Sequence, residues 1–274
     1  MRADLVTSLK TPVKSVEAVP RKSYDIEELQ RMGEALSDRA NVVSAPDNPM
    51  GIPGIDPVIS TYIITRDNDL IPMPHITPRD RNRLLIHSQV LTSLKFGIRN
   101  FFTISGDPID SSVNSKEVRE VDSSGMAAVL RSSYSYISRG TVEEKIALGS
   151  AINPYRENEE SIVKSKLALG SDFFISQVLF EPEALTRDWI KKRNFRVLAG
   201  FMPITKKGQL EFVKRIGSRI PESVIRRIEN SNSLEETSSR IIKEVYDDLK
   251  GYVDGIHLMP LGRTKLAASI LECL

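Results

Sequence analysis

Short, mostly apolar runs rich in β-branched residues alternate along this chain with longer segments of helical period, and this alternation is its most constraining feature. Parallel strands buried on both faces have this near-continuous apolar character, and each needs a helical crossover to reach the next. The predicted strands span residues 14–18, 41–45, 71–75, 98–105, 145–151, 172–178, 195–202 and 253–259. Eight such units in 274 residues favour a single-domain (βα)8 barrel of the TIM type over residues 1–274, because an open doubly wound sheet normally has fewer strands.

Two of the intervening segments carry clear helix signals. A helix is predicted over 78–97, with Thr77 as its N-cap, Pro78 as its first residue and Gly97 just past its end. Its buried face is expected at residues three and four apart, namely Leu84, His87, Leu91 and Leu94. A second helix is predicted over 236–250, with an apolar stripe of Ile241 or Ile242, Val245 and Leu249.

Composition narrows the class of protein. Lysine and arginine number 38 against 36 acidic residues, so neither nucleic acid nor an anionic membrane is an expected partner. The single cysteine, Cys273, allows no internal disulfide and no thiolate-rich metal site, and no metal is expected. Residues 1–6 lack an apolar signal core and no apolar run approaches 18 residues, so a cytoplasmic protein with no membrane span is expected.

Polar residues end, follow or lie within seven of the predicted strands, and the carboxyl ends of the strands are where a barrel keeps its chemistry. They are Glu17, Asp47, His75, Asp107, Asn153, Gln177 and His257. Two long loops, residues 46–57 and 106–125, also follow strands. One such residue alone is most simply a strand or turn cap, whereas several at one end of a barrel indicate a site.

Glu17 lies between Val16 and Ala18 in an apolar strand. A partly desolvated carboxyl has a raised pKa, which suits acid catalysis. The alternative is an ion pair with Arg21 or Lys22.

The other polar residues also allow two interpretations. Asp107 either acts chemically or forms the turn that Gly-Asp-Pro favours. A buried Gln177 amide needs partners, and the edge of a heteroaromatic ligand offers both donor and acceptor. His257 is interpreted as a core histidine, and the basic clusters 79–83 and 191–193 as solvated surfaces. The sequence contains no Gly-x-Gly-x-x-Gly after a strand, no P-loop and no His-Glu-x-x-His.

Residues 75–82 (HITPRDRN) and 94–108 (LKFGIRNFFTISGDP) resemble the methylenetetrahydrofolate reductase family, in which a "PHxT" strand end precedes a helix and a "GIRN…GDP" strand end. Further matches, in order, are residues 16–17, 172–177, 200–204, 219–221 and 255–259. The resemblance covers nearly the whole chain.

The resemblance implies a barrel that binds FAD without a Rossmann fingerprint and passes a hydride from NADH or NADPH to the methylene group of a reduced folate or related tetrahydropterin. Glu17 would be the general acid that protonates the bridging nitrogen. Asp107 would favour the resulting cation. Gln177 would hydrogen-bond the pterin and the nicotinamide.

The resemblance also implies binding residues. Those for the cofactor are His75, Thr77, Ser105, Gly106, Asp107, Asn153, Glu159 and Lys166. Those for the substrate are Asp47, Gln177, Met259 and Leu261. The chain departs from the family pattern at Ser105, near Asn153, at 259–262 and at 206–207, where a covering aromatic is replaced by two lysines.

Three alternatives stay open at this point. One is a flavin-independent reductase of the same substrate class. Another is a non-catalytic barrel that binds a one-carbon enzyme as a partner. A phosphate-binding barrel enzyme is disfavoured, because Gly255 and Gly262 are too sparse for a glycine-rich phosphate loop. Apolar helix surfaces leave room for a homo-oligomer.

Overall fold

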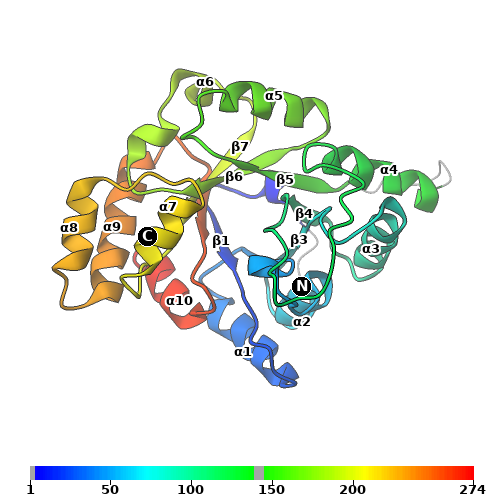
Figure 1. Ribbon diagram of the computed structural model, residues 1–274, viewed down its shortest axis with the longest axis horizontal. Coiled ribbons are helices and arrows are strands. Elements are labelled where there is room, and N and C mark those ends of the chain that lie inside the picture. The colour runs from blue at the N-terminus through cyan, green and yellow to red at the C-terminus, as the bar shows by residue number, and fades with distance from the viewer. Residues whose placement is uncertain (1–3, 139–144) are drawn as a thin grey trace.

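Eight parallel strands form a closed barrel in the order of the chain, each paired with its neighbours and β8 with β1 (Figure 1). The strands of this computed structural model are β1 (Val13–Glu17), β2 (Val42–Ala45), β3 (Ile71–Ile76), β4 (Asn100–Thr103), β5 (Ala147–Ile152), β6 (Phe173–Val178), β7 (Arg196–Phe201) and β8 (Gly255–Leu258). All eight predicted strands are confirmed, to within two residues at each end. The structure describes residues 4–138 and 145–274, so residues 1–3, the start of the segment predicted to lack a signal core, lie outside it.

Helices surround the barrel on the outside (Figure 1). They are α1 (Ile26–Leu36), α2 (Pro57–Thr65), α3 (Arg83–Lys95), α4 (Met126–Ser138), α5 (Glu159–Ala168), α6 (Asp188–Lys191), α7 (Gln209–Arg215), α8 (Glu222–Glu229), α9 (Leu234–Leu249) and α10 (Thr264–Glu272). Short 3-10 helices lie at Val6–Ser8, Pro49–Gly51 and Pro182–Leu185. The connection from β7 to β8 carries α7, α8 and α9. This arrangement is the predicted TIM-type barrel.

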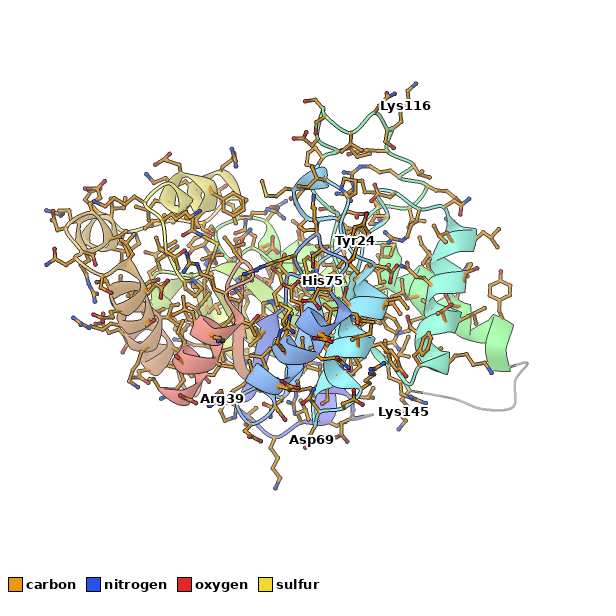
Figure 2. All side chains as sticks on the ribbon, turned by 90° about the horizontal axis from the view of Figure 1, so that it is seen from below. Tyr24, Arg39, Asp69, His75, Lys116 and Lys145 are labelled. Carbon is orange, nitrogen blue, oxygen red and sulfur yellow. The ribbon has the colours of Figure 1, made fainter. Side chains whose placement is uncertain are left out.

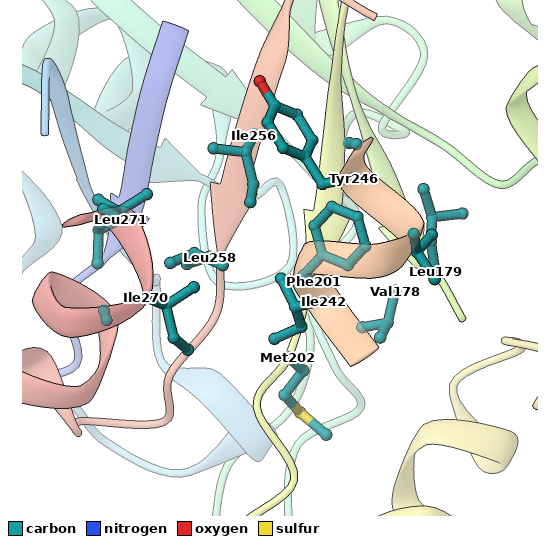
Figure 3. Close-up of a cluster of buried hydrophobic side chains, with 14 of the residues drawn as sticks. Val178, Leu179, Phe201, Met202, Ile242, Tyr246, Ile256, Leu258, Ile270 and Leu271 are labelled. Atoms are coloured by element: carbon teal, nitrogen blue, oxygen red, sulfur yellow. The ribbon is translucent and has the colours of Figure 1, made fainter. Parts of the chain in front are cut away.

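Side chains of each strand alternate between two apolar layers. The inner cluster fills the barrel and includes Val13, Met73, Phe102, Phe173 and Leu198. Gly149 makes room for it, because a Cβ there would come within 2.4 Å of the Phe173 ring. The outer layer joins strands to helices; Figure 3 shows Phe201 of β7 and Ile256 and Leu258 of β8 among side chains of α9, such as Tyr246, and of α10.

The predicted helix over 236–250 is confirmed as α9. Its buried residues include Ile241, Ile242, Val245 and Leu249, which form the expected stripe. The stripe belongs to the same apolar cluster as the outward-facing side chains of β7 and β8.

The prediction for 78–97 is partly wrong. Helix α3 starts at Arg83, and its N-cap is Asn82, whose side chain accepts a hydrogen bond from the Leu85 amide. The predicted cap, Thr77, instead bonds to Asp47 in the neighbouring loop. The predicted face is also partly wrong: Ile86, Val90 and Ser93 are buried and Leu84 is exposed, whereas Leu94 packs against the apolar cluster as expected. Gly97 does adopt the left-handed conformation expected after a helix end.

Loops at the two ends of the barrel differ in length. Figure 2 shows Lys116, on the loop after β4, and Tyr24, on the loop after β1, towards one end, and Arg39, Asp69 and Lys145 towards the other. We call the first end, formed by the carboxyl ends of the strands and the loops that follow them, the mouth. Across residues 4–138 and 145–274, no helix combines the length and apolarity needed to cross a bilayer.

Candidate active site

Glu17 and His75 face each other at the mouth, from the ends of β1 and β3. Glu17 Oε2 lies 3.8 Å from His75 Nδ1, and the two side chains are only 14% and 4% exposed. Both His75 ring nitrogens lack a hydrogen-bond partner among the described residues. The His75 ring is tilted against Phe102, with 5.0 Å between centroids.

Burial controls the charge of both groups. It raises the pKa of Glu17 to about 7, and the negative charge of Asp107 adds to this effect. Burial likewise lowers the pKa of His75 to about 3, with a smaller contribution from His257. His75 is therefore a neutral imidazole near neutral pH, and Glu17 can hold and release a proton there. The alternative prediction is wrong: among the described residues Glu17 pairs with neither Arg21 nor Lys22, and Arg21 lies 3.7 Å from Glu28.

His257 lies below this pair in the barrel, on β8. It is 1% exposed, and its Nδ1 is 2.9 Å from the Ser15 hydroxyl on β1. Burial lowers its pKa to about 3. These contacts support its interpretation as a core histidine.

Asp107 lies on the exposed loop after β4, and both interpretations of it find support. Its carboxylate accepts a hydrogen bond from the Met50 amide at 2.7 Å, as a turn-forming aspartate would. Gly106 before it has φ +75°, and a Cβ there would lie 3.2 Å from Thr77. The charge of Asp107 nevertheless acts on Glu17, which connects this loop to the acid.

Asp47, Thr77 and Arg81 form a buried polar cluster beside the mouth. One Asp47 oxygen accepts from the Thr77 amide at 2.9 Å and from its hydroxyl at 2.7 Å. Arg81 bonds to both Asp47 oxygens. The interpretation of 79–83 as a solvated surface is therefore wrong for Arg79 and Arg81, which are 1% and 7% exposed. Nearby carboxylates compensate the burial of these charges.

The second basic cluster, 191–193, fits the solvated interpretation only in part. Lys191 and Lys192 are exposed, but Arg193 is mostly buried and bonds to Asp254 at 2.7 Å.

Gln177 lies within the register shift of β6 between Ile175 and Val178 and is half-buried. Its Nε2 donates to the Ile216 carbonyl at 2.8 Å, and its Oε1 accepts from the Val178 amide at 2.9 Å. Asn153, after β5, reaches the neighbouring Gly217 carbonyl at 3.5 Å. The segment between α7 and α8 thus contacts both amides.

Glu159 and Lys166 lie on α5, beneath the end of β5. Glu159 is fully buried; its Oε1 accepts from the Asn153 amide at 2.7 Å. Lys166 donates to the Ala151 carbonyl at 2.6 Å, and burial lowers its pKa. Glu159 Oε2 has no hydrogen-bond partner in the described part of the chain, although Arg156 lies 3.6 Å away.

The remaining predicted residues lie on the mouth loops. Ser105 is exposed, and Met259 is half-buried after β8. Leu261 is 45% exposed and left-handed, with φ 50°.

Two buried polar residues, Arg79 and Ser44 of β2, were not predicted as site residues from the sequence. Arg79 is fully buried, and Ser44 has a buried hydroxyl without a partner among residues 4–138 and 145–274. The alternating Arg-Asp-Arg run directly after a strand was the available signal for paired, rather than solvated, arginines.

This fold and site define a class: a parallel βα barrel with a protonatable carboxyl buried at its mouth. Residues 25–274 match the family model described as methylenetetrahydrofolate reductase, and the chain belongs to this family. Glu17 precedes the matched range. The chain is 24% identical over 275 residues to methylenetetrahydrofolate reductase 2 of Schizosaccharomyces pombe, covering 87% of this chain and 42% of that protein. The chain thus spans under half the length of this relative.

Solved structures share the fold. An uncharacterized protein from Clostridium thermocellum, described as binding two copies of 5-methyl-5,6,7,8-tetrahydrofolic acid, has a TM-score of 0.66 and 16% identity, with 97% of each chain covered. A 2,3-dimethylmalate lyase has a TM-score of 0.55 at 10% identity, over 95% of this chain and 78% of that one. At these identities the similarity establishes the barrel alone.

Proposed function

We propose that this protein reduces the methylene group of a reduced folate, or a related tetrahydropterin, to a methyl group with hydride from NADH or NADPH. The observation that carries the proposal is Glu17, an acid with a pKa of about 7 at the mouth of a barrel of this family. The ligand named for the Clostridium thermocellum protein belongs to the class of the expected product.

Glu17 would supply the proton that opens the substrate ring. A methylene bridge between two nitrogens accepts hydride readily only after one nitrogen is protonated and leaves, which gives an iminium cation. A carboxyl group with a pKa near 7 is protonated in a large fraction of molecules and still transfers its proton easily. The neutral His75 beside it withdraws no proton from it.

Asp107 and Gln177 would act on the substrate ring. The carboxylate of Asp107 favours a nearby cation by electrostatic attraction. The Gln177 amide provides one donor and one acceptor, which suits the edge of a pterin. On binding, a ligand would replace the Ile216 carbonyl and the Val178 amide as the hydrogen-bond partners of the Gln177 side chain.

Several groups at the mouth fit a flavin. The ring nitrogens of His75 are buried and unpartnered within the described residues, which is typical of a site that a ligand completes. The flavin ring would be held by the His75 ring, the Thr77 and Gly106 backbones and Ser105. The ribose and phosphates would lie towards Asn153, Lys166 and Glu159, whose Oε2 has no hydrogen-bond partner among the described residues. When bound, FAD would carry the hydride from the nicotinamide to the substrate.

The test begins with an absorption spectrum of the purified protein from about 300 to 550 nm, with and without NADH or NADPH under anaerobic conditions. We expect a flavin band that bleaches with the nicotinamide and recovers when a methylene-tetrahydropterin is added. A colourless protein that does not take up FAD yet forms the methyl-pterin would support the flavin-independent alternative. Formation of no methyl-pterin with either donor would refute the proposal and favour the non-catalytic barrel.

Glu17→Gln separates the two halves of the reaction. We expect this variant to lose pterin reduction and to keep oxidation of the nicotinamide. Glu211→Gln, an exposed glutamate on α7 paired only with Lys214 in the described structure, is the matched control and should keep both. Equal loss of both half-reactions in Glu17→Gln would remove Glu17 from the role of proton donor.

A further inference from the structure

The buried guanidinium of Arg79 is the feature of the mouth that the proposed reaction does not use. Arg79 is one of the largest fully buried side chains, at 1% exposure. A buried charge of this size is costly unless every donor is paired. Its partners therefore show what it holds in place.

Arg79 connects the loops that follow three successive strands. Its Nε and Nη2 donate to the two oxygens of Asp80, in the loop after β3. Its Nη1 donates to the Asp107 carbonyl at 2.7 Å, after β4, and to the Asn48 carbonyl at 3.3 Å, after β2. Only a planar fork with several fixed donors can make all these bonds at once.

These bonds close a ring around Asp107. Arg79 holds its carbonyl, and the Met50 amide holds its carboxylate at 2.7 Å. Met50 stands two residues after Asn48, whose carbonyl returns to Arg79. Asp107 is thereby fixed both at its backbone and at its charged end.

The loop after β2 needs such support, because its backbone is strained. Asn48 has φ 44°, a left-handed conformation that asparagine tolerates, and Met50 has φ 60°, where its longer side chain makes this conformation unfavourable. Strained residues persist only where surrounding contacts fix them. Asn48 also donates to Asp80 at 3.1 Å, which ties the strained loop to the same carboxylate that orients Arg79.

We propose that Arg79 is a positioning residue: it joins the loops after β2, β3 and β4 and so fixes the carboxylate of Asp107 at the mouth. An effect of Arg79 on catalysis rests on the proposed function, whereas its positioning of Asp107 does not.

The electrostatic consequence falls on Glu17. The charge that acts on Glu17 is that of Asp107, and His75, 3.8 Å away, is kept neutral by burial and by His257. The charges around the Arg79–Asp80 pair are those of Asp47, Asp107, Arg81, Glu117 and Arg119. Among them, Asp107 is the charge that raises the pKa of Glu17. If Asp107 drifts from its place, the pKa of Glu17 should fall towards its ordinary value.

The test is a titration of Glu17 by carbon-13 NMR of the full chain labelled at the glutamate carboxyls, without substrate or cofactor. The Glu17 resonance is identified by its loss in Glu17→Gln. Asp107→Asn should lower the pKa of Glu17 and sets the largest expected shift. Arg79→Lys keeps the charge but loses the fork, and should lower this pKa by no more than that amount. The double variant should match Asp107→Asn alone.

The matched control is Arg131→Lys. Arg131 also bonds to a carboxylate and a carbonyl, those of Asp172 and Gly170, but at the opposite end of the barrel. We expect the titration of Glu17 to remain unchanged in this variant. If Arg79→Lys does not fold, Asn48→Gly carries the test. It keeps the left-handed backbone and both charges but deletes an amide that donates to Asp80 and accepts from the Gly54 amide within the same loop. It should shift the pKa of Glu17 in the same direction.

An unchanged pKa of Glu17 in Arg79→Lys, or in Asn48→Gly where that variant replaces it, would overturn the proposal, as would additive shifts in the double variant or no shift in Asp107→Asn. Because no turnover is measured, a protein that shows the expected shifts but reduces no pterin would refute the proposed function and leave the role of Arg79 intact.

Discussion

Replacing Glu17 by glutamine should stabilise the protein at alkaline pH and leave its stability nearly unchanged in acid. Burial raises the pKa of this carboxyl from 4.5 to about 7. Between these two pH values the folded chain retains a proton that the unfolded chain has lost. The free energy of unfolding of the unchanged chain therefore has its full value below pH about 4.5, and it falls as the pH rises through about 7 and Glu17 ionises in the folded protein.

The size of the effect follows from the two pKa values. Each pKa unit corresponds to about 1.4 kcal/mol, so the ionised carboxylate costs the fold about 3 kcal/mol once the pH exceeds about 7. Glu17 is only 14% exposed, so screening by water reduces this figure little. Glutamine has nearly the same shape and no charge, and a Glu17→Gln variant lacks this cost at every pH.

Urea unfolding of both proteins at pH 5 and pH 8 measures the effect. The free energy of unfolding of Glu17→Gln, relative to the unchanged chain, should be larger at pH 8 than at pH 5 by about 2.5 kcal/mol. Glu211→Gln should show no such pH dependence. Equal differences at the two pH values would mean that Glu17 ionises normally in the folded protein, and the argument for an acid at the mouth would fail.

Three further substitutions test the site and the core. Asp107→Asn should slow pterin reduction more than tenfold with little change in melting temperature; a lower melting temperature with normal turnover would assign Asp107 to the turn at Met50 alone. Asp47→Asn leaves the buried Arg81 with a neutral partner and should destabilise the fold by about 3 kcal/mol, measured by urea unfolding; a loss below about 1 kcal/mol would contradict this pairing. Gly149→Ala places a Cβ within 2.4 Å of a phenylalanine ring of β6 and should lower stability by about 1–3 kcal/mol; an unchanged urea midpoint would show that the inner layer yields easily.

The barrel could be predicted from the sequence because its signal is local. Each buried strand is a short apolar run, and the strand order of a closed βα barrel follows the chain. The face of α3 could not be predicted in this way, because the helix carries two sets of apolar residues with helical spacing. One set contains Leu84 and Leu91, and the other contains Ile86 and Val90. Only the position of the helix on the barrel decides which set is buried.

The polar residues at the mouth show the same division. The position of Glu17 in an apolar strand was enough to predict a desolvated carboxyl. The buried state of Arg81 was not predictable, because its partner Asp47 lies 34 residues earlier in the chain. Thr77, followed by proline, likewise has the sequence pattern of a helix N-cap, and only the folded loops bring it to Asp47 instead.

The pairing of these distant charges is consistent with the raised pKa of Glu17. Arg79 and Arg81 lie near the mouth, and a free cation there would stabilise the carboxylate and lower the pKa of Glu17. Each arginine is instead matched to its own carboxylate, Asp80 or Asp47. His75 is kept neutral by burial, so Glu17 meets no cationic partner among the described residues. A mutation that removes the carboxylate partner of either arginine should therefore lower the pKa of Glu17, although it changes no residue in contact with Glu17.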